Sequence, residues 1–471
     1  MRLPLSLPFF VLSVSAGVIR RASHPVVASY VASASSPGLQ NVPGRYVTTI
    51  QLNGHDFRVA IDTGSSDLWV VAPPDFTYDT SAELPVQFSY GTGTTVNGTT
   101  GFASMQLGGY TFPQQAFGNA YANEVGLGAI LELGLDGLMG LAFNALGSSP
   151  IEQLFSDNGV APVLGQPFLF NIFDQTPNQN NFIAIGLSRT DDLETSAVAS
   201  FTINELDSTY ATAIAATAPV PLFPGNNGRW SVLLDAIFVG DAEIALGSAV
   251  PTTPQGKLVA LMDTGTPAAS LPFDMWYALY SNIPGAMFGY DAETPVFIIP
   301  CATNVVVTVV IGGVSYPIHP LDLSEMVPYS DSTGNSTVCV SSLIPFPTSD
   351  FDALFGDTIM RNIYSVFNFG GTVAKSPTGS ASMNLLSVTD AQQAVADVRS
   401  VRIARFTASQ LPDEYVGVPE GFELAPPGST PAPPPSANAN GAAAAADADP
   451  AQGEGYAHGA PVPNVGTACP R

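Results

Sequence analysis

Short runs of β-branched and aromatic residues dominate the chain from about residue 44 to about residue 388, and Gly, Pro and Asn separate these runs. Runs of this kind predict short strands that are joined by tight turns. Apolar and polar positions alternate most clearly over residues 86–102. The better candidates for short helices are residues 151–155 and residues 273–280, the second of which begins just after Pro272. We therefore predict a mostly-β protein.

The composition of the chain changes towards its C-terminus. Beyond residue 423, Pro, Ala and Gly predominate, for example in the triple proline at residues 433–435 and the alanine run at residues 442–446. Such a segment cannot bury enough apolar surface to offset the entropy that it would lose on ordering. We therefore predict that residues 406–471 form a disordered tail.

The N-terminus has the layout of a secretory signal. A short basic start precedes an apolar stretch that ends with small residues at Ser15 and Ala16. We predict a signal peptide over residues 1–16, a short leader or propeptide over residues 17–43 and a soluble, secreted product. The apolar stretch is too short to span a bilayer, so we expect no membrane association.

Acidic residues greatly outnumber basic ones. The chain has 39 Asp and Glu against 14 Lys and Arg, and no Lys or Arg occurs between Val59 and Ser188. Because nucleic acid binding requires a basic face, we expect no nucleic acid partner. The formal net charge of -25 also suits a secreted protein that works in acid, where few cations remain to repel one another. Solubility through negative charge is the alternative explanation.

Two Asn-x-Thr triplets have the pattern of N-glycosylation acceptors. They begin at Asn97 and Asn335. Such triplets are common by chance, but in a secreted protein we expect both to carry glycans.

The tripeptide Asp-Thr-Gly occurs twice, at Asp62 and at Asp263, and each copy directly follows an apolar run. A single copy is more often an ordinary turn, because Asp and Gly favour turns. Two carboxyl groups at the ends of buried strands, however, can face each other and share one proton. One group then acts as a base that activates water, and the other as an acid that protonates a carbonyl. The duplication therefore predicts peptide hydrolysis without a metal or a covalent intermediate.

The residues around these tripeptides resemble those of the pepsin-like aspartic endopeptidases (peptidase family A1), in particular the secreted fungal type. The likeness spans residues 46–386, within which residues 62–70 match the first active-site motif of the family and residues 263–266 match the second. Tyr90, Gly91 and Thr92 are similar to the hairpin flap that covers substrate. Each tripeptide is followed by an apolar-apolar-Gly segment, at residues 138–140 and 354–356, so the order of motifs repeats.

The resemblance implies a bilobal, pseudo-symmetric β fold with a catalytic cleft between an N-terminal lobe, residues 44–220, and a C-terminal lobe, residues 221–405. Asp62 and Asp263 would hold the nucleophilic water. The supporting residues would be those that donate hydrogen bonds to the outer carboxylate oxygens, Ser65 and Thr266, and those that let the loops approach closely, Gly64 and Gly265. Substrate would contact the flap residues Tyr90, Gly91 and Thr92 and an apolar pocket formed by Ala60, Leu135 and Leu138. Such a pocket implies cleavage next to large hydrophobic residues.

The resemblance also carries expectations about cysteines. Cys301 falls where the disulfide of the family's C-terminal lobe begins, so we expect a bridge from Cys301 to Cys339 and leave Cys469 over. In the chain-entropy description, a disulfide bridge that closes a loop of this length stabilises the fold by about 4 kcal/mol.

The chain departs from the family pattern at three places. Pro267 stands where the family usually has Ser, residues 71–85 lack the Cys of an N-terminal-lobe disulfide, and the leader is short and lacks Lys. The position of Pro267 predicts a different loop after the second aspartate, because proline has no backbone donor and a fixed φ.

Other classes of protein remain to be weighed. Metalloproteases and serine hydrolases are disfavoured because the four His residues form no metal-ligand or triad pattern. A glycoside hydrolase also uses two carboxyl groups but does not require duplicated glycine turns or a tyrosine flap. The main alternative is a catalytically inactive pepsin-like binding or inhibitor protein, since fold does not guarantee activity. We expect a monomeric enzyme that acts on proteins and peptides and needs no metal or cofactor.

Overall fold

The structure is a computed structural model. It describes residues 37–42, 44–91, 94–122, 127–144, 149–175, 181–189, 199–223, 229–291, 294–332, 334–346, 350–370 and 381–429. The expected signal peptide, most of the leader, Thr92 and Cys469 lie outside these residues.

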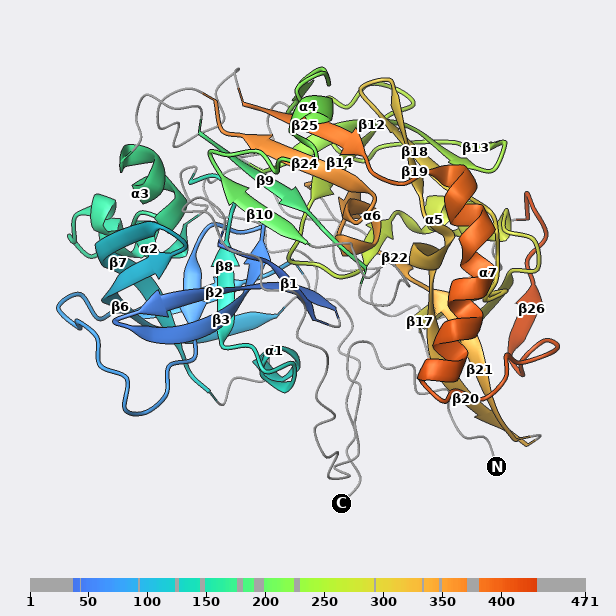
Figure 1. Cartoon of the computed structure of the whole chain (residues 1–471), viewed down its shortest axis with the longest axis horizontal. Coiled ribbons are helices and arrows are strands. Elements are labelled where there is room, and N and C mark those ends of the chain that lie inside the picture. Colours follow the sequence, from blue (N-terminus) through green and yellow to red (C-terminus); the bar gives the residue numbers. More distant parts are fainter. Residues whose placement is uncertain are drawn as a thin grey trace, which may run out of the picture.

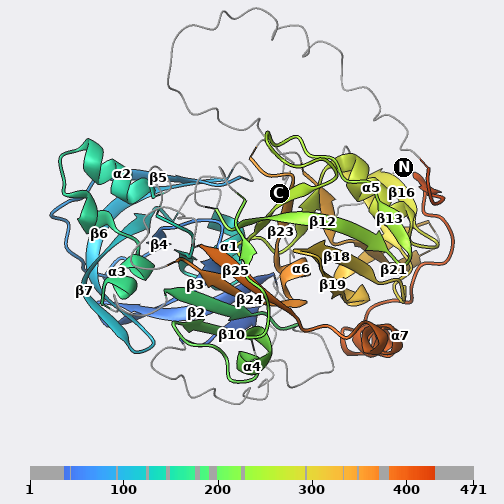
Figure 2. The same ribbon diagram turned by 90° about the horizontal axis from the view of Figure 1, so that it is seen from above.

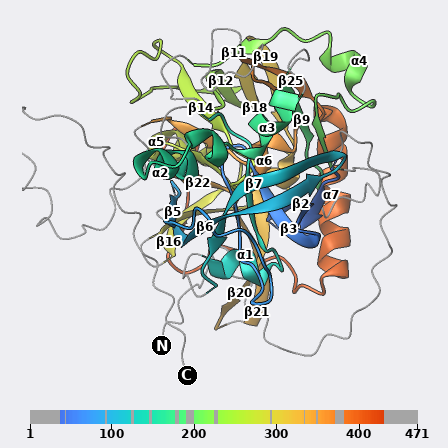
Figure 3. The same cartoon turned by 90° about the vertical axis from the view of Figure 1, so that its left-hand side faces the viewer.

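An eight-stranded sheet forms the N-terminal lobe (Figure 1, blue to cyan). Its strand order is β1-β2-β3-β8-β4-β7-β6-β5, and the long β6–β7 hairpin lies on the outer side of the lobe (Figure 3). The strands are β1 (Gln40–Val42), β2 (Arg45–Leu52), β3 (His55–Asp62), β4 (Leu68–Val70), β5 (Pro85–Ser89), β6 (Thr95–Leu107), β7 (Tyr110–Ala120) and β8 (Gly137–Gly140).

A second eight-stranded sheet forms the core of the C-terminal lobe and repeats the central pairing of the first. In the first sheet, β3 pairs parallel with β8, which pairs antiparallel with β4; in the second, β14 pairs parallel with β23, which pairs antiparallel with β15. The strands are β12 (Ser231–Val239), β13 (Ala242–Ile244), β14 (Leu258–Met262), β15 (Ala269–Leu271), β18 (Val307–Ile311), β19 (Val314–Ile318), β22 (Leu343–Pro345) and β23 (Ala353–Phe355). This repetition is the structural form of the duplicated sequence motif.

Two five-stranded sheets complete the β structure. The first joins the lobes, because it combines strands from both halves of the chain in the order β10-β9-β24-β25-β11 (Figure 2). Its strands are β9 (Phe182–Gly186), β10 (Ser200–Ile203), β11 (Val220–Pro221), β24 (Ile363–Asn368) and β25 (Ser382–Ser387). The second lies in the C-terminal lobe and consists of β16 (Met287–Asp291), β17 (Thr294–Ile299), β20 (Ser324–Asp331), β21 (Gly334–Ser341) and β26 (Phe422–Leu424). The mostly-β prediction is confirmed.

The helices are short except for the last one. Both helices expected from sequence are present, as α2 (Pro150–Asp157) and α5 (Phe273–Ser281). The others are α1 (Gly128–Glu132), α3 (Phe168–Gln175), α4 (Ala211–Ile214), α6 (Asp357–Met360) and α7 (Ala391–Ala408), with 3₁₀ turns at Pro162–Gly165 and Pro320–Leu323. Ser149 caps α2 by accepting a hydrogen bond from the Glu152 amide, and Pro150 occupies its first turn.

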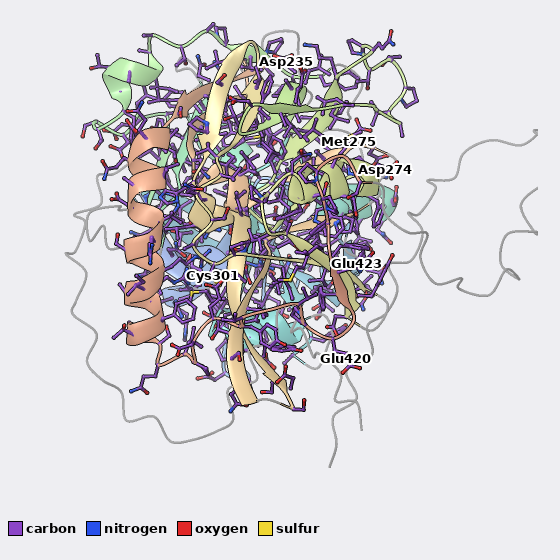
Figure 4. All side chains as sticks on the ribbon, turned by 90° about the vertical axis from the view of Figure 1, so that its right-hand side faces the viewer. Asp235, Asp274, Met275, Cys301, Glu420 and Glu423 are labelled. Carbon is purple, nitrogen blue, oxygen red and sulfur yellow. A yellow bond between two sulfur atoms is a disulfide. The ribbon has the colours of Figure 1, made fainter. Side chains whose placement is uncertain are left out.

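Residues 406–429 do not follow the prediction of a disordered tail. Helix α7 continues to Ala408, and β26 adds an edge strand beside β16. Figure 4 shows α7 along one side of the C-terminal lobe, near Cys301, and Glu420 and Glu423 in the segment that follows. Phe422 is buried, and the Ala425 amide donates to the Ala286 carbonyl. A few apolar anchors therefore order a segment whose average composition is poor in them.

Candidate active site

The two Asp-Thr-Gly segments follow buried strands that occupy equivalent places in the two large sheets. β3 ends at Asp62 beside β8, and β14 ends one residue before Asp263 beside β23. Asp62 is only 3% exposed and Asp263 only 8%. Equivalent strand ends thus present two buried carboxyl groups, one from each lobe.

The threonines of the two tripeptides join the lobes through hydrogen bonds. The Thr63 amide donates to the Thr264 hydroxyl oxygen at 3.1 Å, and the Thr264 amide donates to the Thr63 hydroxyl oxygen at 3.0 Å. Each hydroxyl in turn donates to a carbonyl of the opposite lobe, Thr63 to Met262 at 2.8 Å and Thr264 to Ile61 at 3.1 Å. Both side chains are fully buried, so these bonds fix the separation of the two loops without competition from water.

Each of the two buried carboxyl groups accepts two hydrogen bonds from its own loop. For Asp62 the donors are the Gly64 amide at 2.7 Å and the Ser65 hydroxyl at 2.5 Å. For Asp263 they are the Gly265 amide at 2.8 Å and the Thr266 hydroxyl at 3.1 Å. One carboxyl oxygen receives the amide and the other the hydroxyl in both lobes. The carboxyl groups are therefore held in defined orientations before any substrate arrives.

Glycine is required at the second position after each aspartate because the loops approach so closely. A Cβ atom on Gly265 would lie 2.3 Å from Oδ1 of Asp62, and one on Gly64 would lie 2.8 Å from the carboxyl group of Asp263. Both distances are far below van der Waals contact. Each glycine thus makes room for the carboxyl group of the other lobe.

The environment of the pair favours a shared proton. Burial is the main cause that raises the pKa of Asp62 well above its usual range, and the neighbouring Asp263 carboxyl group raises it further. The hydrogen bonds from Ser65 and Gly64 act in the opposite direction, because they favour the ionised form. Two like charges so close together cannot both form easily, which favours a pair that carries a single charge.

The flap residue Tyr90 lies at the end of β5, in the hairpin that leads to β6. Its amide donates to the Thr94 carbonyl at 2.9 Å, and its hydroxyl oxygen accepts a hydrogen bond from Trp69 Nε1 at 2.5 Å. Tyr90 and Trp69 are thus joined by a hydrogen bond between their side chains. Gly91 is exposed in the same turn, and its partner Thr92 lies outside the described residues.

The expected pocket residues gather in one apolar cluster with the flap. Ala60, Leu135 and Leu138 are buried in a cluster that also contains Trp69, and Tyr90 packs against it. This cluster is separate from the main core of the molecule, which lies on the other face of the strands. The structure thus brings together the residues that the resemblance assigned to the pocket.

Comparison with known proteins identifies the family. The family model described as eukaryotic aspartyl protease matches residues 45–375. The chain belongs to this family. The aspartic protease is 28% identical to pepsin A of Sus scrofa over 337 residues, which cover 66% of this chain and 75% of the relative. It is 27% identical to penicillopepsin-3 of Penicillium janthinellum over 364 residues, which cover 74% of this chain and 82% of the relative.

A third relative is the major aspartyl peptidase 1 of Cryptococcus neoformans var. grubii, which is 25% identical over 347 residues, 67% of this chain and 64% of the relative. With these relatives and the family match, the chain is an aspartic-type endopeptidase. The family and the class of enzyme that the resemblance implied are thus confirmed.

A third buried carboxyl group, that of Asp67, lies near the first loop of the aspartic protease and was not predicted from the sequence. Asp67 accepts hydrogen bonds from the Ser149 hydroxyl at 2.9 Å and the Ser66 hydroxyl at 3.0 Å. Burial raises the pKa of Asp67 to about 7, although both hydroxyls act to lower it. The sequence does indicate that this carboxyl group is buried, because Asp67 lies within residues 62–70 and directly precedes an apolar triplet.

The second loop is fastened to the start of α6 by backbone carbonyls. The Asp357 amide donates to the Thr266 carbonyl at 2.9 Å, and the Pro267 carbonyl accepts from the amide and hydroxyl of Thr358. Proline at 267 lacks an amide but keeps the carbonyl that these contacts use. The loop is therefore anchored despite the departure from the family pattern.

The other predicted sites lie away from the dyad. Cys301 and Cys339 form the expected disulfide, and both are buried. Asn335 is exposed at the start of β21, whereas Asn97 lies on β6 and accepts a hydrogen bond from Gln87, so glycosylation at both stays a prediction. Among the described residues there is no group of His, Cys, Asp and Glu suited to a metal ion, and no helix there has both the length and the apolar character to cross a membrane.

Proposed function

We propose that this endopeptidase hydrolyses peptide bonds at acidic pH through a water molecule held between Asp62 and Asp263. The observation that carries the proposal is the mirrored pair of buried carboxyl groups, each fixed by a glycine amide and a hydroxyl from its own loop. The raised pKa of Asp62 supports a state with one proton on the pair. That state supplies base and acid together.

In the proposed reaction, the ionised carboxylate takes a proton from the water as the oxygen attacks the scissile carbonyl carbon. The protonated carboxyl group donates its proton to the carbonyl oxygen, so that a neutral tetrahedral gem-diol forms. In the collapse of this intermediate, the carboxyl group that took the proton from water donates it to the leaving nitrogen, the other carboxylate takes a proton from one hydroxyl of the diol, and the C–N bond breaks. The carboxyl pair ends the cycle with one proton, as it began.

The apolar cluster around Trp69 and Tyr90 supports a preference for large hydrophobic residues at the cleavage site. Ala60, Leu135 and Leu138 offer no charge or hydrogen-bonding group from their side chains. A charged substrate side chain would lose its hydration there without compensation. Secretion, a monomeric state and action on protein substrates complete the proposal and rest on the sequence and on the family.

A digestion assay tests the proposal. Acid-denatured haemoglobin is incubated with the full chain at several pH values between about 2 and 8, with and without pepstatin, at constant ionic strength. We expect a bell-shaped dependence of the initial rate with its maximum in acid, and complete inhibition by pepstatin. A maximum at or above neutral pH would contradict the dyad mechanism, and absence of any hydrolysis would favour the inactive binding protein.

A further inference from the structure

A buried carboxylate outside the catalytic pair, that of Asp322, interacts with two arginines. Arg189 donates to Oδ2 of Asp322 from Nη2 at 2.6 Å and from Nε at 3.0 Å, and Nε of Arg361 forms an ion pair with Oδ1 at 3.3 Å. Asp322 is only 4% exposed. A buried charge is tolerated only when partners of opposite charge hold it closely. The three side chains therefore form one tightly linked unit.

This unit is attached to the C-terminal end of α6, because Arg361 and Asn362 directly follow that helix. The Asn362 side chain is fully buried and donates from Nδ2 to Oδ2 of Asp322 at 2.9 Å and to the Thr358 carbonyl at 3.1 Å. Its Oδ1 accepts a hydrogen bond from Nη2 of Arg189 at 2.5 Å. Asp322 is thus joined to α6 both by an ion pair and through an amide.

The opposite end of α6 holds the loop that follows the second Asp-Thr-Gly segment. The Asp357 amide donates to the Thr266 carbonyl at 2.9 Å, and the Thr358 amide and hydroxyl donate to the Pro267 carbonyl at 3.2 and 3.0 Å. The packing leaves no slack, since a Cβ on Gly356 would lie 2.1 Å from the Thr266 carbonyl oxygen. A movement of α6 must therefore move this loop.

Helix α6 has a single turn, so its position depends on what holds its two ends. Figure 1 shows it between the sheet that joins the lobes and the C-terminal lobe. Arg189, which follows β9 of the joining sheet, and Asp322, in the 3₁₀ turn Pro320–Leu323, approach it from different parts of the chain. Their ion pair thus fixes α6 against both parts of the molecule.

We infer that Asp322 is a positioning residue for Asp263, and that it acts through Arg361, Asn362 and α6 on the loop that orients the Asp263 carboxyl group. The last step of this path is the hydrogen bond from the Thr266 hydroxyl to Oδ2 of Asp263 at 3.1 Å. The inference rests on the proposed dyad mechanism. Asp322 takes no part in proton transfer and touches no substrate.

The expected effect is on turnover more than on binding. A displacement of about 1 Å in a catalytic group can reduce the rate about a hundredfold, because the reacting atoms lose their alignment. The flap and the apolar pocket beside it belong to the N-terminal lobe, and their residues form a cluster of their own. Loosening of α6 should therefore lower kcat and leave KM almost unchanged.

Three variants interrupt the path at different points. Asp322→Asn keeps the shape of the side chain and removes its charge. Arg189→Met is the milder change, because it leaves Asp322 paired with Arg361, so it serves if Asp322→Asn fails to fold. Thr358→Val removes only the hydroxyl that donates to the Pro267 carbonyl.

Asp235→Asn is the matched control, since Asp235 is a half-buried aspartate of the same lobe whose ion pair is with Lys257. Initial rates on a peptide substrate are measured at the acidic optimum of the unmodified protein, and pepstatin titration counts the folded sites. We expect kcat to fall about tenfold or more in Asp322→Asn and severalfold in Arg189→Met and Thr358→Val, with KM within about twofold. Asp235→Asn should keep kcat within about twofold.

A double-mutant cycle separates positioning from a general loss of stability. Because Asp322 and Thr358 act on the same loop through the same helix, Asp322→Asn combined with Thr358→Val should have a kcat within about twofold of Asp322→Asn alone. Independent effects would multiply. Arg189→Met replaces Asp322→Asn in the cycle if the latter does not fold.

Thermal unfolding of each variant completes the experiment. The inference is overturned if folded variants melt at lower temperature with kcat unchanged, if KM rises while kcat stays the same, or if the effects in the cycle multiply. Absence of pepstatin-sensitive hydrolysis in the unmodified protein would instead refute the proposed function.

Discussion

Single atoms decide the geometry of the Asp62/Asp263 pair. The Oδ1 atoms accept hydrogen bonds from glycine amides and the Oδ2 atoms from hydroxyls, and the proposed mechanism requires that the pair share one proton. Asp62→Asn and Asp263→Asn each replace an ionisable oxygen by an amide of almost the same shape. We expect each variant to fold and to lose about a thousandfold or more of kcat, because neither can hold the shared proton. Initial-rate assays provide the measurement, and Asp75→Asn, which changes an exposed aspartate, is the control. Retention of a few per cent of the activity by either active-site variant would contradict the mechanism.

A methyl group on Gly265 tests the closeness of the two loops. The added Cβ would lie 2.3 Å from Asp62 Oδ1 and 2.5 Å from its carboxyl carbon, so the two carboxyl groups must move apart. For Gly265→Ala we expect a loss of at least about a hundredfold in kcat. Gly247→Ala is the matched control, because the nearest atom to its Cβ is a methionine methyl group at 3.9 Å. Equal activity of the two variants would show that the loops adapt freely.

Asp67 makes the stability of the N-terminal lobe dependent on pH. Its pKa in the folded protein is about 7, against 3.8 for the free side chain, and no Lys or Arg between Val59 and Ser188 compensates its charge. The stabilisation is complete below about pH 4 and is lost as the pH rises through 7, by up to roughly 4 kcal/mol. Asp67→Asn keeps an oxygen that can accept from Ser149 and cannot ionise.

We therefore expect the melting temperature of Asp67→Asn to match that of the unmodified protein in acid and to exceed it increasingly between pH 5 and 7. Calorimetric scans over this range provide the measurement. The buried Asp322 is a useful contrast, since Arg189 and Arg361 outweigh its burial and lower its pKa. A constant difference between the two proteins at all pH values would assign Asp67 a packing role only.

At the scale of elements, α7 and the segment that follows it are the part that the sequence failed to predict. The buried residues of α7 are Ala394, Val398, Val401 and Arg402, a narrow stripe that contains small side chains and a charge. Arg402 can be buried because its guanidinium donates to the carbonyls of Cys301, Leu321 and Ser324. No periodicity analysis assigns an arginine to a core face, because its partners are distant in sequence.

The elements around the catalytic pair could be predicted, because their local signals agree with the fold. β3 and β14 are apolar runs that end in a turn tripeptide, and α2 starts with a Ser cap and a proline. The long-range contacts could not be predicted in this way, because the hydrogen bond from Trp69 to Tyr90 and the parallel pairing of β3 with β8 join residues that are distant in sequence.

Truncation separates the ordered part of the C-terminal segment from the rest. A chain that ends after Ser409 loses β26, the burial of Phe422 and the bond from the Ala425 amide. Loss of the Phe422 burial alone should reduce the free energy of unfolding by about 2 kcal/mol. A chain that ends after Ser429 keeps these contacts, and we expect its melting temperature to equal that of the full chain. Thermal scans of both chains in acid would disprove this assignment if the two truncations behaved alike.

At the scale of the whole molecule, buried carboxyl groups are of two kinds. Asp322 of the C-terminal lobe interacts with Arg189 and Arg361, whereas Asp62 and Asp67 lie in a stretch of the N-terminal lobe, residues 59–188, that contains no Lys or Arg. The arginines compensate the charge of Asp322 over a wide range of pH. The buried carboxyl groups of Asp62 and Asp67 are stable only at acidic pH, where they can stay protonated. Neutral pH should therefore destabilise the N-terminal lobe before the C-terminal lobe. Because each lobe contributes one carboxyl group to the candidate active site, a change in either lobe affects the site.

The four hydrogen bonds that Thr63 and Thr264 make across the lobes, two to each other and one each to the carbonyls of Met262 and Ile61, have the symmetry of a two-fold axis. Rotation by half a turn exchanges each donor with its equivalent and each acceptor with its equivalent, from Ile61 to Met262. Such an isologous contact is the kind that two identical subunits form in a homodimer. The contact between the two lobes thus resembles the contact between two identical subunits of a dimer. Because the lobes are covalently linked, each can change its sequence independently of the other. The difference between Ser65 and Thr266, which donate to equivalent carboxyl oxygens, is then an asymmetry that only a fused dimer can hold.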